Sequence, residues 1–330
     1  MKNILITTIF LFISTIVLPN QSDKLEREKL ISQIITLAEN NICNPAFLET
    51  DEWKSFTTKL QSDEMQHMDD ASFELAFNLA VRSLPFTHFY INYKEQSLSI
   101  ETKKSEKRKA AFELKEIDET TAILTVRSFI SDARGMVKLV KEIEAKSYQN
   151  LIIDLRNNTG GTLDAAVVLG RFLTNDMIDA GTYLTRNWFM ENGRYPSLEE
   201  INSFPFLTDM TYKGFQKMSQ GNGFRMVLPP HSNPIFKGNT YVLTNSKTAS
   251  TCEPFVHLLK SKGKTIIGET TAGAMLSGRW FKLDDSFSLF VPIIDYVTAD
   301  GNRLDKVGIT PNIEVNSEDA LSEALKQLKE

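Results

Sequence analysis

Hydrophobic residues in the first quarter of the chain recur at intervals of three and four, the period of an amphipathic helix. They fall into three stretches between Leu25 and Leu84, and Asp69 or Asp70 is a suitable N-cap for the third. The members are Leu30, Ile34, Ile35 and Leu37; then Trp53, Phe56 and Leu60; then Phe73, Leu75, Phe77, Leu79 and Leu84. This pattern predicts a small bundle of three helices.

The period changes in THFYINYKEQSLSIETKK, from residue 87 on, which alternates between apolar and polar residues as a β-hairpin does. TAILTVRSF at 121–129 predicts a strand, and residues 133–145 predict a helix. NLIIDLRNNTGGTLDAAVVLGRFL predicts a buried strand, a glycine turn and a helix. NTYVLTNS, a helix over 251–262 and KTIIGET repeat this order. Alternating strands and helices predict an α/β core.

A long insertion, residues 175–238, interrupts this alternation and is rich in aromatic residues. They are Trp188, Phe189, Tyr195, Phe204, Phe206, Tyr212, Phe215 and Phe224. An insertion of this kind is either a lid or binding wall over a cleft, or a satellite core under a loop. After the core, NSEDALSEALKQLK predicts an amphipathic helix. The expected division is a helical domain with a hairpin at 21–110 and a catalytic core at 111–330.

Residues 1–20 have the pattern of a secretory signal. Lys2 precedes an apolar stretch from Ile4 to Leu18 that is short for a membrane span. We therefore expect a secreted or periplasmic protein with no stable membrane span after signal removal. An uncleaved N-terminal anchor is the alternative.

Composition excludes several classes of protein. The 330 residues are 42% hydrophobic and suffice for a full core, while the net charge of −5 leaves only KKSEKRK at 103–109 as a basic run. We interpret that run as a solvated loop or strand edge, so no nucleic-acid partner is expected. Cys43 and Cys252 are the only cysteines, which excludes a disulfide framework, and no cluster has zinc spacing.

The stretch SKTASTCEPF, residues 246–255, holds a candidate nucleophile. Ser250 and Glu253 form the pattern of a capping box at a helix start, which explains both residues structurally. The same position suits a nucleophile, because backbone N–H groups at a helix start can stabilise an oxyanion. Cys252 lies about 200° around the helix from Ser250 and is expected to be a small buried residue.

Gly160 and Gly161 follow a buried strand, so they either serve only the turn or place a second backbone N–H in the same cleft. RNNTGGT lacks the lysine of a phosphate-binding loop. Of the four histidines, His67 is expected to face solvent, His231 lies in a turn, and His257 is about 10 Å along the helix from Ser250. His88, at the junction of the bundle and the first strand, is either a packed junction residue or the base.

Three motifs together, LIIDLRNNTGG, YVLTNSKTASTCEPF and TIIGETTAGA, resemble those of the C-terminal processing, or tail-specific, peptidases. That family includes the core of tricorn protease and the repeats of interphotoreceptor retinoid-binding protein. The resemblance implies a crotonase- or ClpP-like α/β core with an N-terminal helical bundle domain, and peptide hydrolysis through a serine without a cofactor.

The resemblance places the nucleophile on Ser250 and the oxyanion donors on Thr251 and the pair Gly160 and Gly161. Many members use a lysine base where this chain has Ala274. The tricorn-like branch instead uses a histidine just before a strand, which corresponds to His88 in LPFTHFYI.

The third member of that branch is a glutamate, and DGNRLDKVGITPNIEV offers Asp305 in its place. Residues 89–121 are too few for the PDZ module that many members insert, so the chain resembles a PDZ-less branch. The expectation is a serine peptidase acting on peptides or proteins. The alternatives are an esterase, or a non-catalytic module that binds an apolar ligand.

Overall fold

The structure is a computed structural model, and it describes residues 21–94, 110–130, 133–209 and 212–329. The expected signal, the basic run at 103–109 and the second half of the expected hairpin lie outside these residues. Within the described part of the chain, no helix is long and apolar enough to cross a membrane.

The N-terminal bundle consists of α1 (Gln21–Asn41), α2 (Asp51–Leu60), the short α3 (Asp63–Gln66) and α4 (Asp70–Ala80), with the 3₁₀ turns η1 (Pro45–Glu49) and η2 (Val81–Ser83). The three expected helices correspond to α1, α2 and α4. Asp69 is the N-cap of α4, where its side chain accepts a hydrogen bond from the Ser72 N–H. The apolar faces of these helices meet in one aromatic-rich core.

A six-stranded sheet has the order β11-β8-β7-β4-β3-β2. It is parallel from β11 to β3, and only β2 (Phe112–Asp118) pairs antiparallel. The remaining strands are β3 (Thr121–Val126), β4 (Asn150–Asp154), β7 (Asn239–Thr244), β8 (Thr265–Gly268) and β11 (Ile313–Glu314). This sheet confirms the expected α/β core.

Helices cover both faces of this sheet. Residues of α6 (Ala133–Lys146), α7 (Leu163–Leu173) and α11 (Cys252–Ser261) share a core with Leu151 and Ile153. On the other face, α12 (Ala320–Gln327) packs against Ile152. Successive residues of a strand point to opposite faces, and both faces of this sheet are covered, which explains why the central residues Leu151, Ile152 and Ile153 of β4 are all apolar.

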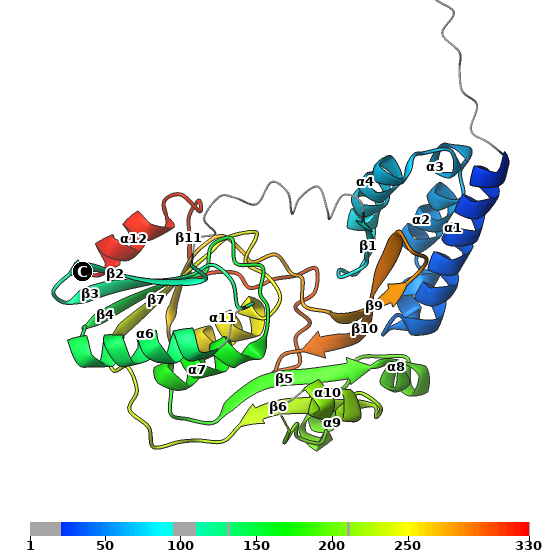
Figure 1. Cartoon of the computed structure of the whole chain (residues 1–330). Helices are drawn as coiled ribbons and strands as arrows, with labels where there is room; N and C mark the ends of the chain where they lie inside the picture. The colour runs from blue at the N-terminus through cyan, green and yellow to red at the C-terminus, as the bar shows by residue number, and fades with distance from the viewer. Residues whose placement is uncertain (1–20, 95–109, 131–132, 210–211, 330) are drawn as a thin grey trace, which may run out of the picture.

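A second, antiparallel sheet has the order β1-β10-β5-β6, with β9 also paired to β10. Its strands are β1 (Tyr90–Tyr93), β5 (Ile178–Thr185), β6 (Gly223–Leu228), β9 (Ser277–Lys282) and β10 (Phe287–Val297). The bundle and the six-stranded sheet lie at opposite ends of the molecule, with β5 and β10 between them (Figure 1). Residues of β9 and β10 belong to the core of the bundle.

Only the first half of the hairpin expected after residue 87 lies within the described residues. Its first strand, β1, is present, but it pairs with β10, some 200 residues further along the chain. Alternation identifies a strand and one buried face, but it does not identify the partner. This pairing attaches the bundle to the second sheet. It also fixes the position of His88, which lies two residues before β1.

The insertion contains β5, β6 and three short helices, α8 (Arg186–Asn192), α9 (Leu198–Ser203) and α10 (Tyr212–Met218). Its aromatic residues mostly serve packing. A satellite core contains Trp188, Phe189, Tyr195 and Phe204, while Phe215 and Phe224 pack in the main core and Phe206 is 52% exposed. The satellite-core interpretation is the one that this packing supports.

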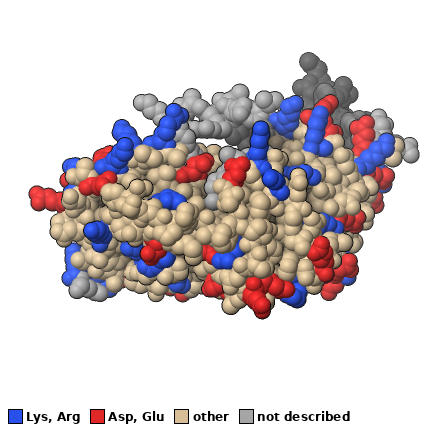
Figure 2. All heavy atoms as spheres, turned by 90° about the horizontal axis from the view of Figure 1, so that it is seen from below, with Lys and Arg blue, Asp and Glu red and all other residues tan. Residues whose placement is uncertain are grey.

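Acidic and basic side chains are interspersed on the face shown in Figure 2. This face does not present a basic stripe of the kind that binds a nucleic-acid backbone.

Candidate active site

Ser250 lies between β7 and α11 with a φ of 56°, in the left-handed region. The structure corrects the expected capping box, because the helix begins at Cys252 with Thr251 as the N-cap and no side-chain cap. Only half of the box forms, where the Ser250 N–H donates to Glu253 Oε2 at 3.2 Å. The hydroxyl of Ser250 makes no hydrogen bond among the described residues. A serine held in a strained conformation with a free hydroxyl indicates a functional role.

Glu253 fixes the segment behind Ser250. Its side chain is fully buried and accepts hydrogen bonds from the N–H groups of Gly273 and Ala274, at 2.8 and 2.7 Å, and from the Thr271 hydroxyl at 2.7 Å. Burial raises the pKa of this carboxyl group, while the hydrogen bonds oppose that rise. The Ala274 carbonyl in turn accepts from the Ser250 N–H at 3.0 Å. Ala274 therefore contacts Ser250 through its backbone.

The glycine turn lies directly against the candidate nucleophile. A Cβ on Gly160, which has a φ of 93°, would lie 2.7 Å from Ser250 Cβ and 3.0 Å from the Thr251 nitrogen. The Thr251 hydroxyl donates to the Gly161 carbonyl at 2.7 Å. Only a residue without a side chain fits at position 160.

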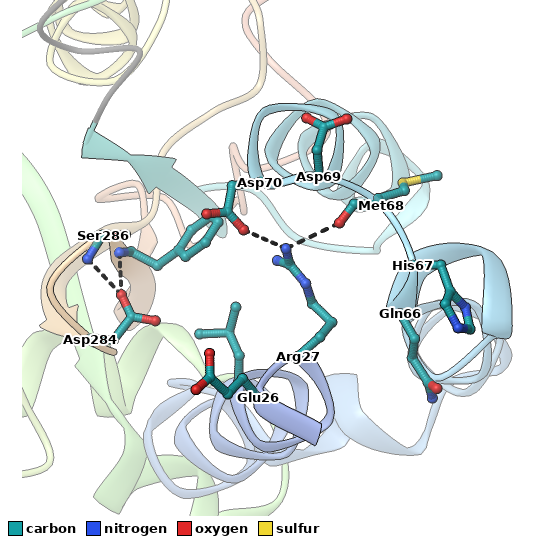
Figure 3. A pocket seen from close by; sticks show the side chains of 11 residues that line it. Glu26, Arg27, Gln66, His67, Met68, Asp69, Asp70, Asp284 and Ser286 are labelled. Atoms are coloured by element: carbon teal, nitrogen blue, oxygen red, sulfur yellow. Dashed lines mark hydrogen bonds and ion pairs between the residues drawn. The ribbon is translucent and has the colours of Figure 1, made fainter. Parts of the chain in front are cut away.

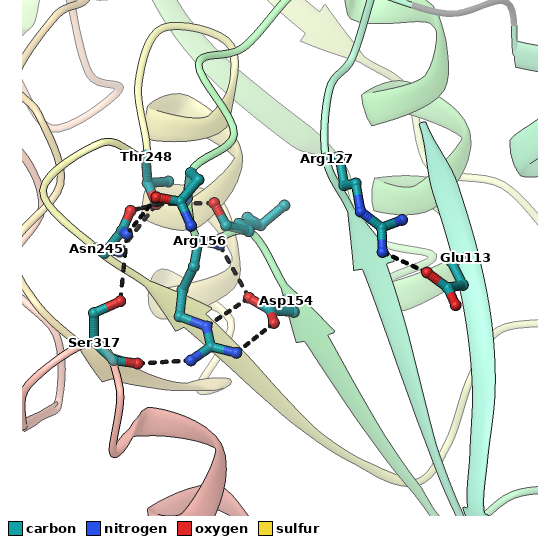
Figure 4. A network of polar contacts seen from close by, with 9 residues as sticks. Glu113, Arg127, Asp154, Arg156, Asn245, Thr248 and Ser317 are labelled. Carbon is teal, nitrogen blue, oxygen red and sulfur yellow. Dashed lines mark hydrogen bonds and ion pairs between the residues drawn. The ribbon is translucent and has the colours of Figure 1, made fainter. Parts of the chain in front are cut away.

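Polar contacts join the motif DLRNNTGG, which contains the glycine turn, to the motif NSKTAS, which precedes Thr251 (Figure 4). The Thr248 hydroxyl donates to the Leu155 carbonyl at 2.9 Å, and the Asn157 N–H donates to Asn245 Oδ1 at 2.9 Å. Arg156 forms a forked pair with the Asp154 carboxylate. The motifs DLRNNTGG and NSKTAS are thus registered against each other by their own side chains.

Two backbone N–H groups near Ser250 are available for an oxyanion. Among the described residues, neither the Gly161 nor the Thr251 N–H has a hydrogen-bond acceptor. The Gly160 N–H, in contrast, donates to Asn158 Oδ1 at 2.9 Å. Of the expected donors, the geometry therefore leaves Gly161 and Thr251 free to bind a developing negative charge.

His88 also has a left-handed backbone, with a φ of 58°. Its Nδ1 lies 2.8 Å from the hydroxyl of Thr87, and that hydroxyl donates to Asp305 Oδ1 at 2.5 Å. The Thr87 N–H donates to Asp305 Oδ2 at 3.1 Å. Asp305, 1% exposed, thus contacts His88 through Thr87 instead of directly.

This arrangement determines the tautomer of the imidazole. The Thr87 hydroxyl has one proton, which it donates to Asp305, so it accepts the proton of His88 Nδ1–H. The Nε2 of a neutral His88 is then unprotonated and can act as a base.

A chain of contacts connects Ser250 to His88. The Ser250 N–H donates to the Ala274 carbonyl, the neighbouring Met275 N–H donates to Asp305 Oδ1 at 3.0 Å, and Asp305 leads through Thr87 to His88. Ser250 and His88 themselves are not hydrogen-bonded in the described structure. Catalytic hydrogen bonds in substrate-free enzymes are often longer than in the complex.

Arg303 is a third partner of the Asp305 carboxylate, after Thr87 and the Met275 N–H. The guanidinium group donates to Asp305 Oδ2 at 3.1 Å and lies 3.6 Å from Asp295 Oδ2. Asp295 is fully buried, which raises the pKa of its carboxyl group, and accepts a hydrogen bond from the Tyr195 hydroxyl at 2.7 Å. The insertion therefore reaches the candidate acid through Tyr195, Asp295 and Arg303.

Burial lowers the pKa of His88 below its usual value of 6.5, and the charge of Asp305 opposes this effect in part. His88 is consequently neutral, and competent as a base, at neutral pH. The other three histidines have partners elsewhere. His67 contacts the Asp63 carbonyl, His231 the Thr174 carbonyl and His257 the Asp300 carboxylate.

Cys252 is fully buried, and burial raises the pKa of its thiol, so the expected inert role is supported. Lys306, beside Asp305, has a pKa lowered by burial, but its Nζ donates to the Arg82 carbonyl at 3.2 Å.

Two of the hollows in the described structure differ in size and lining. Figure 3 shows one on the bundle, where Arg27 is paired with Asp70 among Glu26, Asp69 and Asp284; it holds no candidate nucleophile. The other is an apolar recess beside Thr251 with a cavity volume of about 40 Å³. Leu163, Ala166, Val167, Met226, Pro254 and Leu258 contribute to its lining.

The sequence patterns did not reveal Thr87, Arg303 or the buried role of Glu253. Each of these residues gains its role through contacts with distant segments, so no local signal marks it. The strained backbone at the site is a tertiary feature as well. Among the described non-glycine residues, positive φ occurs at His88, Ser147, Asn157, Ser250 and Lys306.

The pattern of peptidase family S41 matches residues 120–315. Carboxy-terminal processing protease CtpA of Bacillus subtilis is 24% identical over 231 residues, which are 69% of this chain and 40% of the relative. For CtpB of the same organism the identity is 24% over 200 residues, 60% of this chain and 34% of the relative. The chain thus spans less than half the length of these two curated relatives.

Two solved structures share the fold. A lipoprotein from Streptococcus agalactiae has a TM-score of 0.57 at 20% identity, covering 96% of this chain and 99% of its own. The photosystem II D1 C-terminal processing protease has a TM-score of 0.51 at 16% identity, covering 91% and 94%.

Proposed function

Because this chain belongs to peptidase family S41, we propose that it is a serine peptidase with Ser250 as nucleophile, His88 as base and Asp305 as the orienting acid. The C-terminal processing family expected from the three motifs is confirmed, as is the α/β core with N-terminal helices. The residue roles and the substrate are the proposal.

The observation that carries the proposal is the continuous set of contacts from Ser250 through Ala274, Met275, Asp305 and Thr87 to His88. Four separate segments of the sequence meet there. Two of them present Ser250 and His88 in strained backbone conformations, which persist only where the surrounding structure enforces them.

In the proposed mechanism, Ser250 Oγ attacks the scissile carbonyl carbon while its proton passes to His88 Nε2. The carbonyl oxygen becomes negative and accepts hydrogen bonds from the N–H groups of Gly161 and Thr251. The imidazolium is stabilised by its Nδ1–H bond to Thr87, whose own proton points to Asp305. His88 then protonates the leaving amine, and water, activated by the same base, hydrolyses the acyl-enzyme.

The geometry gives little support to the alternative of an apolar-ligand carrier. The apolar recess beside Thr251 encloses about 40 Å³, whereas ligand pockets measure roughly 300–1,000 Å³. The larger hollows of the described structure, about 480–580 Å³ in volume, are lined largely by polar and charged residues. A small apolar side chain next to the scissile bond fits the recess better. An esterase would use the same residues, and substrate profiling separates it from a peptidase.

We further propose a secreted or periplasmic location, on the basis of Lys2 and the apolar stretch Ile4–Leu18. N-terminal sequencing of protein recovered from the exported fraction tests this. A cytoplasmic protein that keeps residues 1–20 would contradict it.

The catalytic proposal is tested by labelling with a fluorophosphonate probe and by peptide hydrolysis. Ser250→Ala should abolish labelling and lower kcat by a factor on the order of 10⁶, as loss of a triad nucleophile does. Cys252→Ala is the matched control, because Cys252 lies two residues after Ser250 as the first residue of α11, and it should retain both signals. An inactive Cys252→Ala with an active Ser250→Ala would reject the serine assignment.

A further inference from the structure

Three aromatic residues form a row across β1, β10 and β9. Tyr90 is in register with Phe290, and Phe290 with Trp280. The rings of Tyr90 and Phe290 stack with centroids 4.9 Å apart, and Trp280 meets them edge-on at 5.3 and 5.2 Å. Residues in register on adjacent strands point to the same face, so the three rings form one continuous surface, the aromatic row.

The aromatic row lies on the face of the sheet that is turned away from the bundle. Its neighbours Ile91, Leu289 and Val291, which point to the opposite face, are fully buried in the core of the bundle. Trp280, in contrast, is 50% exposed, and Tyr90 and Phe290 are half-buried. None of the three rings belongs to a hydrophobic core formed by the described residues. Partly exposed aromatic rings that contact one another outside the hydrophobic cores indicate a binding surface.

A glycine makes room for this arrangement. A Cβ on Gly278 would lie 2.5 Å from the Phe290 ring, so the ring covers the backbone of β9 where no side chain intervenes. The position of Phe290 is therefore fixed by the sheet, and the aromatic row is preorganised for a ligand.

The aromatic row begins at the candidate base. His88 lies two residues before Tyr90, and the centroids of its ring and that of Phe290 are 6.2 Å apart. A general base must reach both the nucleophile and the leaving amine. An extended peptide advances about 3.3 Å per residue, so the 6.2 Å between the rings of His88 and Phe290 corresponds to about two residues of an extended substrate.

We propose that the aromatic row is a specificity subsite that binds an aromatic side chain of the peptide substrate close to the scissile bond. This inference rests on the proposed peptidase function. The row is uncharged and entirely aromatic, and ring–ring contacts favour an aromatic partner over an aliphatic or acidic one.

The test uses pairs of fluorogenic peptides that differ only by Phe or Ala at one position, with each of the two positions on either side of the cleaved bond taken in turn. For the wild type, Phe should raise kcat/KM roughly 10- to 100-fold at one of these positions, in line with the loss of a well-filled apolar pocket. Trp280→Ala and Phe290→Ala should bring that ratio close to one, and Trp280→Phe should keep most of it. The ratio is measured within one variant, so general damage to the enzyme cancels.

Phe206→Ala is the matched control, because Phe206 is an equally exposed aromatic residue in the insertion, and it should leave the ratio unchanged. An unchanged ratio in Trp280→Ala, or no preference for Phe at any position in a wild type that cleaves the peptides, overturns the inference and leaves the peptidase proposal standing. A wild type that takes the fluorophosphonate label but cleaves no peptide rejects both.

Discussion

At the scale of single residues, the acid, the base and the hydroxyl between them decide the pH dependence. The Thr87 hydroxyl donates a hydrogen bond to Asp305 and accepts one from His88. The Asp305 carboxylate therefore polarises the imidazole through this hydroxyl, because the two groups make no direct hydrogen bond. Burial lowers the pKa of His88. The fraction of His88 in the neutral, basic form increases as the pH rises through that pKa. A lower pKa therefore moves the acid limb of the pH–rate profile to lower pH.

We therefore predict that kcat/KM rises along an acid limb whose midpoint lies below the usual histidine pKa of 6.5. Thr87→Val removes the acceptor for the His88 Nδ1–H, so it should lower kcat/KM by about 10² or more, with a limit near the 10⁴ that follows loss of the orienting acid of a triad. It should also move the limb further to acid, because the imidazolium loses a stabilising bond. Thr87→Ser keeps the hydroxyl and should preserve rate and midpoint. Equal profiles for Val and Ser would show that Thr87 serves only packing.

At the scale of the elements, the strand–turn–helix containing Gly160 and the turn before α11 form one unit. Gly160 lies against Ser250 and Thr251 with a positive φ, so a side chain there must displace the nucleophile or the oxyanion donor. Gly263 follows α11 with a φ of 74°, and a Cβ added to it would meet no other atom within 4 Å. Both glycines have a positive φ, but only at Gly160 would an added Cβ collide with neighbouring residues.

Gly160→Ala should consequently lower kcat/KM by about 10² to 10³, the effect of losing one oxyanion donor. Gly263→Ala should change only the melting temperature, by the modest penalty for an alanine at positive φ. Kinetics and thermal melting of both variants make the comparison. If Gly160→Ala has full activity and a normal melting curve, the glycines serve only to form the turn and are not required to position the catalytic groups.

At the scale of the whole molecule, the bundle and the catalytic core depend on each other. The buried residues Phe287, Leu289 and Val291 of β10 complete the core of the bundle. Arg186 of the insertion donates to the carbonyls of Ile42 and Glu39 at 2.6 and 2.8 Å. His88 lies at the end of the bundle and Ser250 lies in the core, so an intact site requires both parts.

We predict that the two parts unfold together. Trp53 reports on the bundle and Trp188 on the insertion, so variants with a single tryptophan allow each part to be followed by fluorescence in urea. The two transitions should coincide. Leu289→Ala, which creates a cavity in the shared core, should destabilise both by about 2–5 kcal/mol. If Leu289→Ala shifts the urea midpoint reported by Trp53 and leaves the midpoint reported by Trp188 unchanged, the bundle is an independent domain.

The sequence by itself determined the elements and the chemistry. Periodicity predicted α1, α2, α4 and the alternating strands and helices of the core, because burial of one face imposes a local repeat on the residues. Three motifs in order sufficed for the family and for Ser250 as a candidate, since those residues are contiguous.

Only the tertiary structure decided how distant segments meet. The pairing of β1 with β10, the position of Thr87 between His88 and Asp305, and the contact of Gly160 with Ser250 all join residues about 90 to 220 positions apart. Half of the expected capping box at Ser250 was wrong for the same reason. The strained backbone at Ser250 is maintained by the segment around Ala274, whose approach no local pattern records.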